Sequence, residues 1–446
     1  MTHRPEFLIA ATKSGSGKTL LTLGILAALR KRGYNVQPFK CGPDFIDPSL
    51  HRLMVERESY NLDLRMMGDK GCRDSYKRYS RDADIVVTEG VMGLFDGGIA
   101  SSAELAKKLR VPVLLIIDVR SAAESVAAIV KGFEMYDPDV KLCGVICNRI
   151  GSERHRDLID QAVNSHCKTP IVGHFPRNDS FEMPSRHLGL HMGHEIGPEL
   201  LEVDTLVKAI EGNIDLDAIL NQSGQKLSMS QGDIQQKKSE KMRLAVAYDE
   251  AFCFYYPENF DILRRHGITP VFFSPLYDEA VPEDVSGIYF GGGYPELHAP
   301  QLSNNGPMID SIRAWADHDG FVYGECGGFM YMCSSLADAQ GNVHPMTDLF
   351  HVKVQMKERL SSLGYREATL LHDSPIGNSG DICYGHEFHY SEIIERDKEL
   401  DFLYKLQDAR LEGCLRGNCL GSYVHLHFSR TAFLLNTLLR RLPDSC

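Results

Sequence analysis

The sequence predicts two α/β domains, each with its own parallel β-sheet, separated by a polar linker. In the first half of the chain, short apolar runs alternate with helical patterns. The alternation stops in residues 221–241, which are rich in Ser, Gln and Lys, and it resumes at residue 242. The length of 446 residues is also too great for one ordinary hydrophobic core. We therefore expect domains at residues 1–220 and 242–446 and an interdomain linker at 221–241.

The strands of the first domain are predicted by nearly continuous apolar runs. Such runs suit parallel strands that are covered on both faces. The segment LLTLGILAALRKRG between two of them has a helical pattern and ends in basic residues and a glycine. The pattern indicates a doubly wound α/β sheet. The predicted strands are residues 7–11, 84–90, 111–118 and 142–148.

Composition excludes several classes of protein. The formal net charge of -12 disfavours a general nucleic-acid binder, which is usually basic. No run of about 18 apolar residues is present, so no membrane span is expected. The 12 cysteines are scattered, and the apolar stretch near the N-terminus is too short for us to expect a signal peptide, which predicts reduced thiols in a cytoplasmic protein. Cys143 and Cys147 have no second Cys/His pair at matching spacing, which disfavours a structural zinc site.

A glycine-rich loop follows the first predicted strand and leads into the first predicted helix. This context is the one that a phosphate-binding loop requires, because glycines let backbone N–H groups surround phosphate oxygens at a helix N-terminus. We expect Lys18 to neutralise the β and γ phosphates and Thr19 to bind magnesium. Thr12 stands where the strict pattern has glycine, but Lys13 produces the variant K-x-G-x-G-K-T. The expected ATP-binding residues of this loop are Lys13, Gly15, Gly17, Lys18 and Thr19.

Acidic residues at the carboxyl ends of neighbouring strands are candidate magnesium ligands. Asp44 and Asp47 lie in FKCGPDFIDP, and Glu89 ends the strand DIVVTEG. Acids in such positions face the ligand crevice of a parallel sheet. The alternative for the two aspartates is turn chemistry beside two prolines. Asp96 in GVMGLFDGG is a further acid, which we assign to the substrate or the reaction intermediate.

Asn148 ends another predicted strand, so it is a candidate for contacting the nucleotide base. The alternative is that its side chain is an ordinary polar group of a loop.

The second domain contains a cysteine in a sharp turn between a strand and a helix. The strand at residues 321–323 enters Gly324-Glu325-Cys326-Gly327-Gly328, the arrangement of a nucleophile elbow. We expect the helix N-terminus to lower the pKa of the Cys326 thiol and the Gly327 N–H to stabilise an oxyanion. Gly292, in the run Gly291–Gly293, is the candidate second donor. The alternative is that Cys326 is a small buried core residue.

A cysteine nucleophile needs a base, and the segment GSYVHLHFSR offers two histidines. On an extended strand His425 and His427 would point to the same face. We choose His425 as the residue that takes and returns the proton. Many related thiol amidotransferases have a carboxylate two residues after this histidine. Here that place is taken by His427, which leaves the group that orients His425 unassigned.

The combination of these motifs resembles the cobyrinic acid a,c-diamide synthase family over nearly the whole chain. The resemblance implies an N-terminal P-loop domain, similar to dethiobiotin synthetase, and a C-terminal domain similar to class I glutamine amidotransferases. The chain departs from the family pattern at Phe45, where relatives often have tyrosine, and we expect little effect from this difference. The motifs that carry the resemblance are FKCGPDFIDPSLH, NLDLRMM, TEGVMGLFDGG, VICNRIGSERH, MPSRHLGL, DEAFCFYYPEN, FFSPL, GGGYPEL, ECGGFMYM, GHEFHYS and SYVHLHF.

The resemblance also implies the chemistry. ATP with magnesium would phosphorylate carboxylates a and c of a polycarboxylate tetrapyrrole. Ammonia from glutamine, released at Cys326 with the help of His425, would then displace the phosphate. A cation-rich stretch suits such an acidic substrate, although a solvated helical face is the alternative. The stretch consists of Arg149, Arg154, His155, Arg156, Arg177, Arg186, His187, His191 and His194.

Two rival functions remain at the level of sequence. A sister enzyme that amidates nickel-sirohydrochlorin shares the same chemistry. A partition-type ATPase switch is favoured by Lys13, which could act across a homodimer, but such a switch has no use for the thiol elbow.

Overall fold

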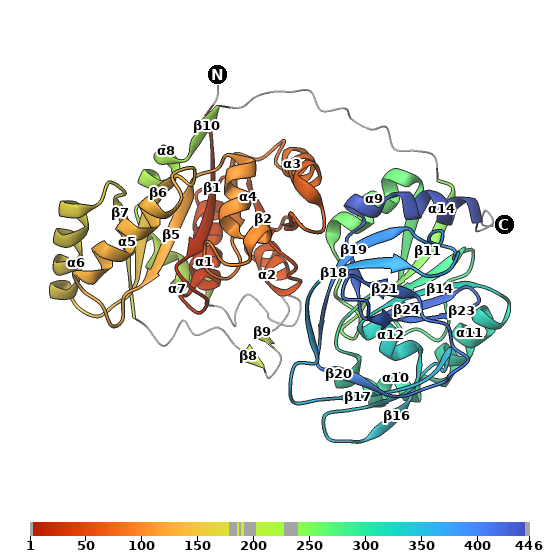
Figure 1. Cartoon of the computed structure of the whole chain (residues 1–446). Helices are drawn as coiled ribbons and strands as arrows, with labels where there is room; N and C mark the ends of the chain where they lie inside the picture. Colours follow the sequence, from red (N-terminus) through yellow and green to blue (C-terminus); the bar gives the residue numbers. More distant parts are fainter. Residues whose placement is uncertain (1–2, 178–184, 187–188, 191–201, 227–239, 442–446) are drawn as a thin grey trace. The chain divides into compact units, whose positions relative to one another are not determined.

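The computed structural model describes residues 3–177, 185–186, 189–190, 202–226 and 240–441. The chain divides into two compact units, Met1–Asp233 and Ile234–Cys446, shown in red to green and in green to blue (Figure 1). Among the described residues, no helix is both long and apolar enough to cross a membrane. Each of the eleven cysteines in this part of the chain is a free thiol.

The first unit contains a sheet with the order β3-β2-β4-β1-β5-β6-β7, in which all these pairings are parallel. The strand order changes direction around β1, which is where doubly wound sheets bind their ligands. Its strands are β1 (His3–Ala11), β2 (Val36–Cys41), β3 (Tyr60–Leu62), β4 (Ile85–Glu89), β5 (Val113–Asp118), β6 (Leu142–Ile150) and β7 (Ile171–Pro176).

Helices connect the parallel strands of this unit. Alternate β1 residues Phe7, Ile9 and Ala11 pack into a core with helices α1, α2, α7 and α8. Leu8 and Ala10 are equally buried and face the other side of the sheet, since side chains alternate along a strand. The helices are α1 (Lys18–Lys31), α2 (Ile46–Val55), α3 (Gly68–Tyr79), α4 (Ser102–Leu109), α5 (Ser125–Tyr136), α6 (Glu153–His166), α7 (Val203–Asn213) and α8 (Leu216–Gln222), with the 3₁₀ helix η1 (Gly98–Ala100).

The first residues of the expected linker are structured. Helix α8 continues to Gln222, and β10 (Gly224–Lys226) pairs antiparallel with the start of β1. The polar composition at residues 221–226 therefore does not prevent secondary structure, because β1 supplies a partner strand. Residues 227–239 lie outside the described residues. Strands β8 (Ser185–Arg186) and β9 (Gly189–Leu190) form a separate antiparallel pair.

The second unit has a central sheet with the order β12-β11-β13-β14-β24-β23. The pairings from β12 to β24 are parallel, and only the β23–β24 pairing is antiparallel. Apolar cores lie on both of its faces. Its strands are β11 (Met242–Ala247), β12 (Ile268–Phe273), β13 (Gly287–Phe290), β14 (Phe321–Glu325), β23 (Cys414–Arg416) and β24 (Cys419–Ser422).

Two further sheets cover this unit, with orders β16-β15-β17-β20 and β22-β21-β18-β19-β25. Their strands are β15 (Cys333–Ala337), β16 (Val343–Pro345), β17 (Phe350–Met356), β18 (Ser362–Leu370), β19 (Ile382–His389), β20 (Ser391–Arg396), β21 (Tyr404–Leu406), β22 (Leu411–Glu412) and β25 (His425–Leu426). The helices are α9 (Pro257–His266), η4 (Pro295–Leu297), α10 (Ala299–Asn304), α11 (Gly306–Asp317), α12 (Gly327–Met332), α13 (Phe428–Thr431) and α14 (Phe433–Arg441). Both units are thus α/β with a parallel sheet, and this part of the prediction is confirmed.

Candidate active sites

The loop between β1 and α1 has the backbone that its glycines allow. Gly15 and Gly17 have φ angles of 76° and 85°, in the left-handed region that favours glycine. An added Cβ at Gly17 would also meet the Asn148 side chain at 2.3 Å. Lys13 lies exposed in this loop. Helix α1 begins at Lys18, so the helix N-terminus is directed at the loop.

Asn148 and Arg149 contact the loop backbone. The Asn148 amide donates to the Ser16 carbonyl at 2.7 Å, and Arg149 donates to the Gly15 carbonyl at 2.9 Å. Asn148 is only 3% exposed. In this structure Asn148 therefore supports the shape of the loop, and its expected contact with a nucleotide base stays a prediction.

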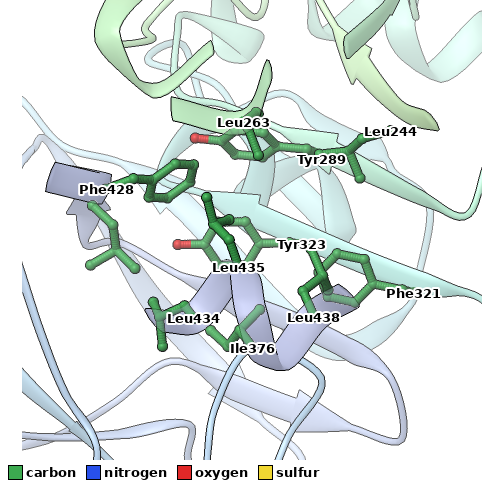
Figure 2. Close-up of a pocket in the computed structure, with 11 residues that line it drawn as sticks. Leu244, Leu263, Tyr289, Phe321, Tyr323, Ile376, Phe428, Leu434, Leu435 and Leu438 are labelled. Atoms are coloured by element: carbon green, nitrogen blue, oxygen red, sulfur yellow. The ribbon is translucent and has the colours of Figure 1, made fainter. Parts of the chain in front are cut away.

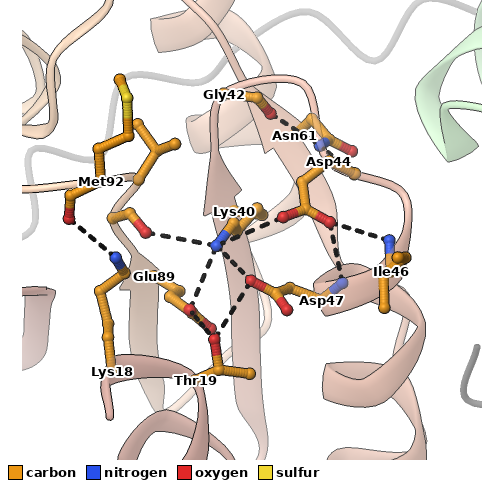
Figure 3. A network of polar contacts seen from close by, with 12 residues as sticks. Lys18, Thr19, Lys40, Gly42, Asp44, Ile46, Asp47, Asn61, Glu89 and Met92 are labelled. Atoms are coloured by element: carbon orange, nitrogen blue, oxygen red, sulfur yellow. Dashed lines mark hydrogen bonds and ion pairs between the residues drawn. The ribbon is translucent and has the colours of Figure 1, made fainter. Parts of the chain in front are cut away.

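A buried acid cluster lies beside the start of α1 (Figure 3). The Thr19 hydroxyl is 3.0 Å from Glu89 Oε1 and 3.5 Å from Asp47 Oδ2. Glu89 ends β4 and is fully buried. Lys18 reaches across to donate to the Met92 carbonyl at 3.0 Å. The structure thus brings Thr19, Asp47 and Glu89 together at the carboxyl edge of the sheet, as the strand ends predicted.

Lys40 and His51 also belong to this cluster, although no pattern in the sequence pointed to them. The Lys40 ammonium donates to Asp47 and to Glu89 Oε1 at 3.2 Å, and it lies 3.7 Å from Asp44 Oδ2. His51 forms a second contact with Glu89, at 2.8 Å. Both residues lie within the motif FKCGPDFIDPSLH. The sequence does not show, however, that the side chain of a lysine inside a strand points toward acidic residues.

The neighbours of Glu89 keep its carboxylate charged in spite of burial. Burial by itself would raise the pKa of Glu89, but Lys40 and the hydrogen bond from His51 hold that pKa well below its ordinary value. Burial and then the neighbouring Lys40 lower the pKa of Lys18. Glu89 is therefore an anion at neutral pH, able to attract a cation.

The donor set of this cluster fits magnesium. A hydroxyl and two carboxylates are hard oxygen ligands, and magnesium bound to a nucleotide takes only one or two carboxylates from the protein. No group of three His, Cys, Asp or Glu in the described ranges forms an all-protein metal site. A site with so few protein ligands suits magnesium bound to a nucleotide, because phosphate oxygens and water would complete the coordination shell of the ion. Thr19, Asp47 and Glu89 are the residues that would hold the ion.

Asp44 and Asp96 have structural contacts of their own. Asp44 Oδ1 accepts from the N–H groups of Ile46 and Asp47 at 2.9 and 3.0 Å, so Asp44 stabilises the start of α2. This is the turn chemistry that was the alternative for this residue. Asp96 is exposed and accepts from the Gly93 N–H at 3.1 Å, which closes the turn after Met92.

In the second unit, Cys326 has the strained backbone of a nucleophile elbow. It lies between β14 and α12 with φ 48° and ψ -102°, a conformation that costs a non-glycine residue roughly 1–3 kcal/mol. Its N–H donates to the Ser422 carbonyl at 2.7 Å, which ties the elbow to β24. Strain of this kind in the turn after a central strand is typical of an exposed nucleophile, yet Cys326 is only 5% exposed.

The glycines around Cys326 are required by close packing. An added Cβ at Gly327 would meet the Gly293 nitrogen at 2.9 Å, and one at Gly328 would meet the Phe290 carbonyl at 2.3 Å. The Gly328 N–H donates to the Gly291 carbonyl at 2.9 Å. The Gly291–Gly293 run therefore lies against the elbow. Gly292 and Gly327, the expected oxyanion donors, thus belong to two adjacent turns, and their role stays a prediction.

The thiol of Cys326 does not have the lowered pKa that the helix N-terminus predicted. Burial and then the negative Glu296 raise the pKa of this thiol, and the hydrogen bond from the Gly327 backbone only partly opposes them. The six-residue α12 is too short and too buried to outweigh desolvation. A base that removes the thiol proton is therefore necessary.

His425 is buried beside the elbow. A Cβ at Gly292 would meet His425 Cε1 at 2.3 Å, so the imidazole lies against the glycine run. The ring stacks on His386 of β19, with centroids 5.0 Å apart. Burial and then His386 lower the pKa of His425 well below its ordinary value. The imidazole is therefore neutral near pH 7 and able to accept a proton.

His427 has contacts of its own, apart from the elbow. Strand β25 ends at Leu426, and His427 Nδ1 accepts from the Ser429 N–H at 3.3 Å as the N-cap of α13. Its Nε2 lies 3.9 Å from Glu258 Oε2. Its backbone is still extended, with φ -101° and ψ 119°, so the expectation that His425 and His427 share one face stays a prediction.

An apolar cavity of about 30 Å³ lies in the core of the second unit, which is room for about one water molecule (Figure 2). Tyr289, Tyr323 and Phe428 are among its lining residues. It is too small and too apolar for glutamine, so it is not the substrate site. Its importance is that Tyr289 and Tyr323 place their hydroxyl groups near the elbow.

The expected cation-rich stretch is only partly described. Arg149 pairs with Asp118 at 2.7 Å, and His155 contacts the Ala122 carbonyl at 2.7 Å. These are contacts within the first unit. His187, His191 and His194, together with the side chain of Arg186, lie outside the described residues, so binding of an acidic substrate here stays a prediction.

Comparison with known proteins identifies both halves of the chain. Residues 7–190 match the CobQ/CobB/MinD/ParA nucleotide binding domain, and residues 243–433 match the CobB/CobQ-like glutamine amidotransferase domain. Cobyrinate a,c-diamide synthase from Caldanaerobacter subterraneus subsp. tengcongensis is 38% identical, over 99% of this chain and 98% of that protein. The enzyme of the same name from Salmonella typhimurium is 38% identical over 96% of each.

The chain belongs to the cobyrinate a,c-diamide synthase family. It is therefore an enzyme, a ligase with a nucleotide-binding domain and a domain that hydrolyses glutamine. The predicted family and fold class are confirmed. Among solved structures, PurLQS from Thermotoga maritima has a TM-score of 0.34 and 13% identity, over 45% of this chain and 98% of that chain.

Within this family, a partition-type ATPase switch is not favoured as the function. The match to synthases extends through the glutamine amidotransferase domain, which such a switch does not need.

Proposed function

We propose that this enzyme uses ATP to amidate the a- and c-carboxylates of cobyrinate with ammonia from glutamine. The observation that carries the proposal is an identity of 38–40%, over 95–99% of this chain, to relatives named cobyrinate a,c-diamide synthase. It is supported by a phosphate-type loop and a thiol elbow on the same polypeptide.

The first unit would make the carboxylate electrophilic. A substrate carboxylate oxygen attacks the γ-phosphorus of ATP, the bond to the β-phosphate oxygen breaks, and an acyl phosphate and ADP form. The loop N–H groups and Lys18 hold the phosphates and stabilise the charge that develops on them. Magnesium, when bound at Thr19, Asp47 and Glu89, supplies further neutralisation of the phosphate oxygens.

The second unit would release ammonia. Cys326 Sγ attacks the side-chain carbonyl carbon of glutamine while His425 takes the thiol proton and passes it to the departing nitrogen. Water then hydrolyses the thioester to glutamate. Ammonia attacks the acyl phosphate, and inorganic phosphate leaves. Two rounds of this chemistry, at carboxylates a and c, complete the proposed reaction in the cytoplasm.

Mass spectrometry of the products tests the substrate. The full chain is incubated with ATP, glutamine and cobyrinate, and a parallel sample receives nickel-sirohydrochlorin. We expect two successive exchanges of OH for NH₂ on cobyrinate, each accompanied by one ADP and one glutamate. Exchange confined to nickel-sirohydrochlorin would reject cobyrinate as the substrate, and ADP formation without any exchange would reject the ligase chemistry.

A further inference from the structure

The catalytic use of His425 raises the question of what orients its imidazole. A base that serves a thiol works efficiently when its second ring nitrogen is held by a third group, which selects the tautomer and stabilises the imidazolium. His427 occupies the place where a carboxylate was expected. Its imidazole caps α13 and faces Glu258, so it does not perform this task.

A carboxylate does reach His425, from a different element. Glu325 is the last residue of β14 and directly precedes Cys326. Its Oε2 lies 3.9 Å from His425 Nδ1, and both side chains are at most 3% exposed. A small rotation of either side chain would convert this ion-pair distance into a hydrogen bond, because catalytic contacts often tighten only when substrate binds.

Glu325 is held in place by three hydrogen bonds. Tyr289 donates to Oε2 at 2.9 Å, and Tyr323 donates to Oε1 at 2.9 Å. The Leu426 N–H donates to Oε1 at 3.0 Å. Leu426 follows His425, so the carboxylate is attached to the strand that carries the imidazole. A carboxylate has about four acceptor positions, and the one left by these three donors is on Oε2, the oxygen nearer to His425.

We infer that Glu325 is the carboxylate that orients His425 for proton transfer from Cys326. It is a positioning residue, because it would act through His425 and not on glutamine. The elbow motif therefore supplies both the nucleophile and, one residue earlier, the group that aligns the base. This inference rests on the proposed glutamine hydrolysis at Cys326.

The environment of Glu325 predicts a measurable pH dependence. Burial raises the pKa of Glu325 to about 7, although its three hydrogen bonds oppose the shift. The imidazole that it faces is also stacked on His386 and lies in the field of His389 and Glu387. Because an ionised carboxylate orients the imidazole best, glutamine hydrolysis is expected to rise as the pH increases through about 7.

The test compares Glu325→Gln with the natural enzyme in the full chain. The amide keeps the volume but removes the charge. We expect kcat for glutamine-dependent amidation to fall about 100-fold with little change in KM for glutamine, since only transition-state stabilisation is lost. Activity with added ammonia is expected to be unchanged. The rise of glutamine hydrolysis near pH 7 is expected to vanish.

Glu258→Gln and Tyr331→Phe are matched controls, and Tyr289→Phe is a second test of the role of Glu325. Glu258→Gln removes the carboxylate that faces His427 and is expected to change glutamine hydrolysis less than about three-fold. If Glu325→Gln does not fold, Tyr289→Phe decides, because it deletes one hydrogen bond to Glu325 with little change of shape. We expect Tyr289→Phe to lower glutamine-dependent kcat about five-fold, the equivalent of one hydrogen bond. Tyr331→Phe, whose buried hydroxyl has no partner among the described residues, is expected to have no effect.

The outcomes separate the inference from the proposed function. A normal kcat and an unchanged pH profile in Glu325→Gln, with Cys326→Ala inactive toward glutamine, would overturn the role of Glu325 alone. Retention of glutamine hydrolysis in Cys326→Ala would instead overturn the proposed thiol chemistry on which the role depends. Equal loss of glutamine-dependent and ammonia-dependent activity in Glu325→Gln would also reject the role, because it would indicate general structural damage.

Discussion

Lys40 is the residue whose charge organises the first candidate site. Its side chain is 3% exposed, and its ammonium contacts Asp47 and Glu89, which would otherwise repel each other in a low-dielectric interior. The contacts raise its pKa well above the ordinary value, although burial by itself would lower it. A buried lysine held so firmly in its charged form acts as a permanent counter-ion.

Replacement of this counter-ion should weaken the first unit. We expect Lys40→Met to destabilise that unit by about 3–5 kcal/mol, because it leaves buried carboxylates without compensation. Hydrogen exchange at β2 and β4, read by mass spectrometry, reports this unit separately from the other. The control Lys31→Met breaks the exposed pair with Asp204 and is expected to leave the exchange rates of β2 and β4 nearly unchanged, because solvent screens that pair. Equal exchange rates in the two variants would contradict the prediction.

At the scale of elements, the glycine run after β13 sets the position of the candidate base. Gly292 leaves just enough space for the His425 ring, and Gly291 and Gly293 pack on the Tyr255 ring and the Ala251 carbonyl. The run and the elbow follow neighbouring parallel strands, β13 and β14. The position of the imidazole therefore depends on two neighbouring turns.

A methyl group added to this run should displace the base. We expect Gly292→Ala to lower glutamine-dependent activity about 100-fold, because misplacement of a catalytic group by about 1 Å has effects of this size. The added Cβ would lie 2.3 Å from His425 Cε1. Ammonia-dependent activity should persist. The control Gly306→Ala adds the same methyl group in open space at the start of α11 and should have normal activity.

The N-cap of α13 makes the second unit sensitive to acid. Burial lowers the pKa of His427 to about 3, from an ordinary value of 6.5. Below pH 6.5 the unfolded chain binds a proton that the folded chain does not, so this residue reduces stability as the pH falls from 6.5 toward 3.

Replacement by asparagine isolates this effect, since asparagine also caps helices well. As the pH falls from 6.5 toward 3, the unfolding free energy of His427→Asn relative to that of the natural enzyme should increase by about 1.4 kcal/mol per pH unit. Fluorescence of Trp315, the only tryptophan in the sequence, reports unfolding of the second unit. A stability difference independent of pH would show that His427 does not titrate differently in the two states.

For the whole molecule, substitutions in the two candidate sites should cause different losses of activity. Lys18→Ala is expected to stop amidation from glutamine and from ammonia, because neither nitrogen source can react with an unactivated carboxylate. Cys326→Ala is expected to lower glutamine-dependent amidation at least about 1000-fold and to leave the ammonia-dependent reaction. Both rates are measured on the same preparations by ADP release and product mass. Loss of ammonia-dependent activity in well-folded Cys326→Ala would contradict the division of labour.

Prediction from sequence succeeded where local signals were strong. The apolar runs at residues 7–11 and 142–148 are β1 and β6, and the loop after β1 has the glycine conformations that its pattern required. Strand β2 was missed because Pro38 and Lys40 interrupt its apolar pattern. Pro38 is tolerated because the pairing of β2 with β3 begins only at Phe39, so Pro38 has a partner strand only on the β4 side. Lys40 is tolerated because its charge is matched by acids.

Local order along the chain determined the two parallel sheets, the phosphate-type loop and the thiol elbow, since each depends on glycines and apolar runs that are adjacent in sequence. Only the tertiary structure decided the partners of the reactive groups. Lys40 meets Glu89 across 49 residues because the parallel strands β2 and β4 bring their carboxyl ends to one edge of a sheet. Glu325 lies near His425, 100 residues further along, because β24 runs parallel to β14 and its carboxyl end, at one edge of the second sheet, leads into β25. Burial at that edge then sets the pKa values on which the chemistry depends.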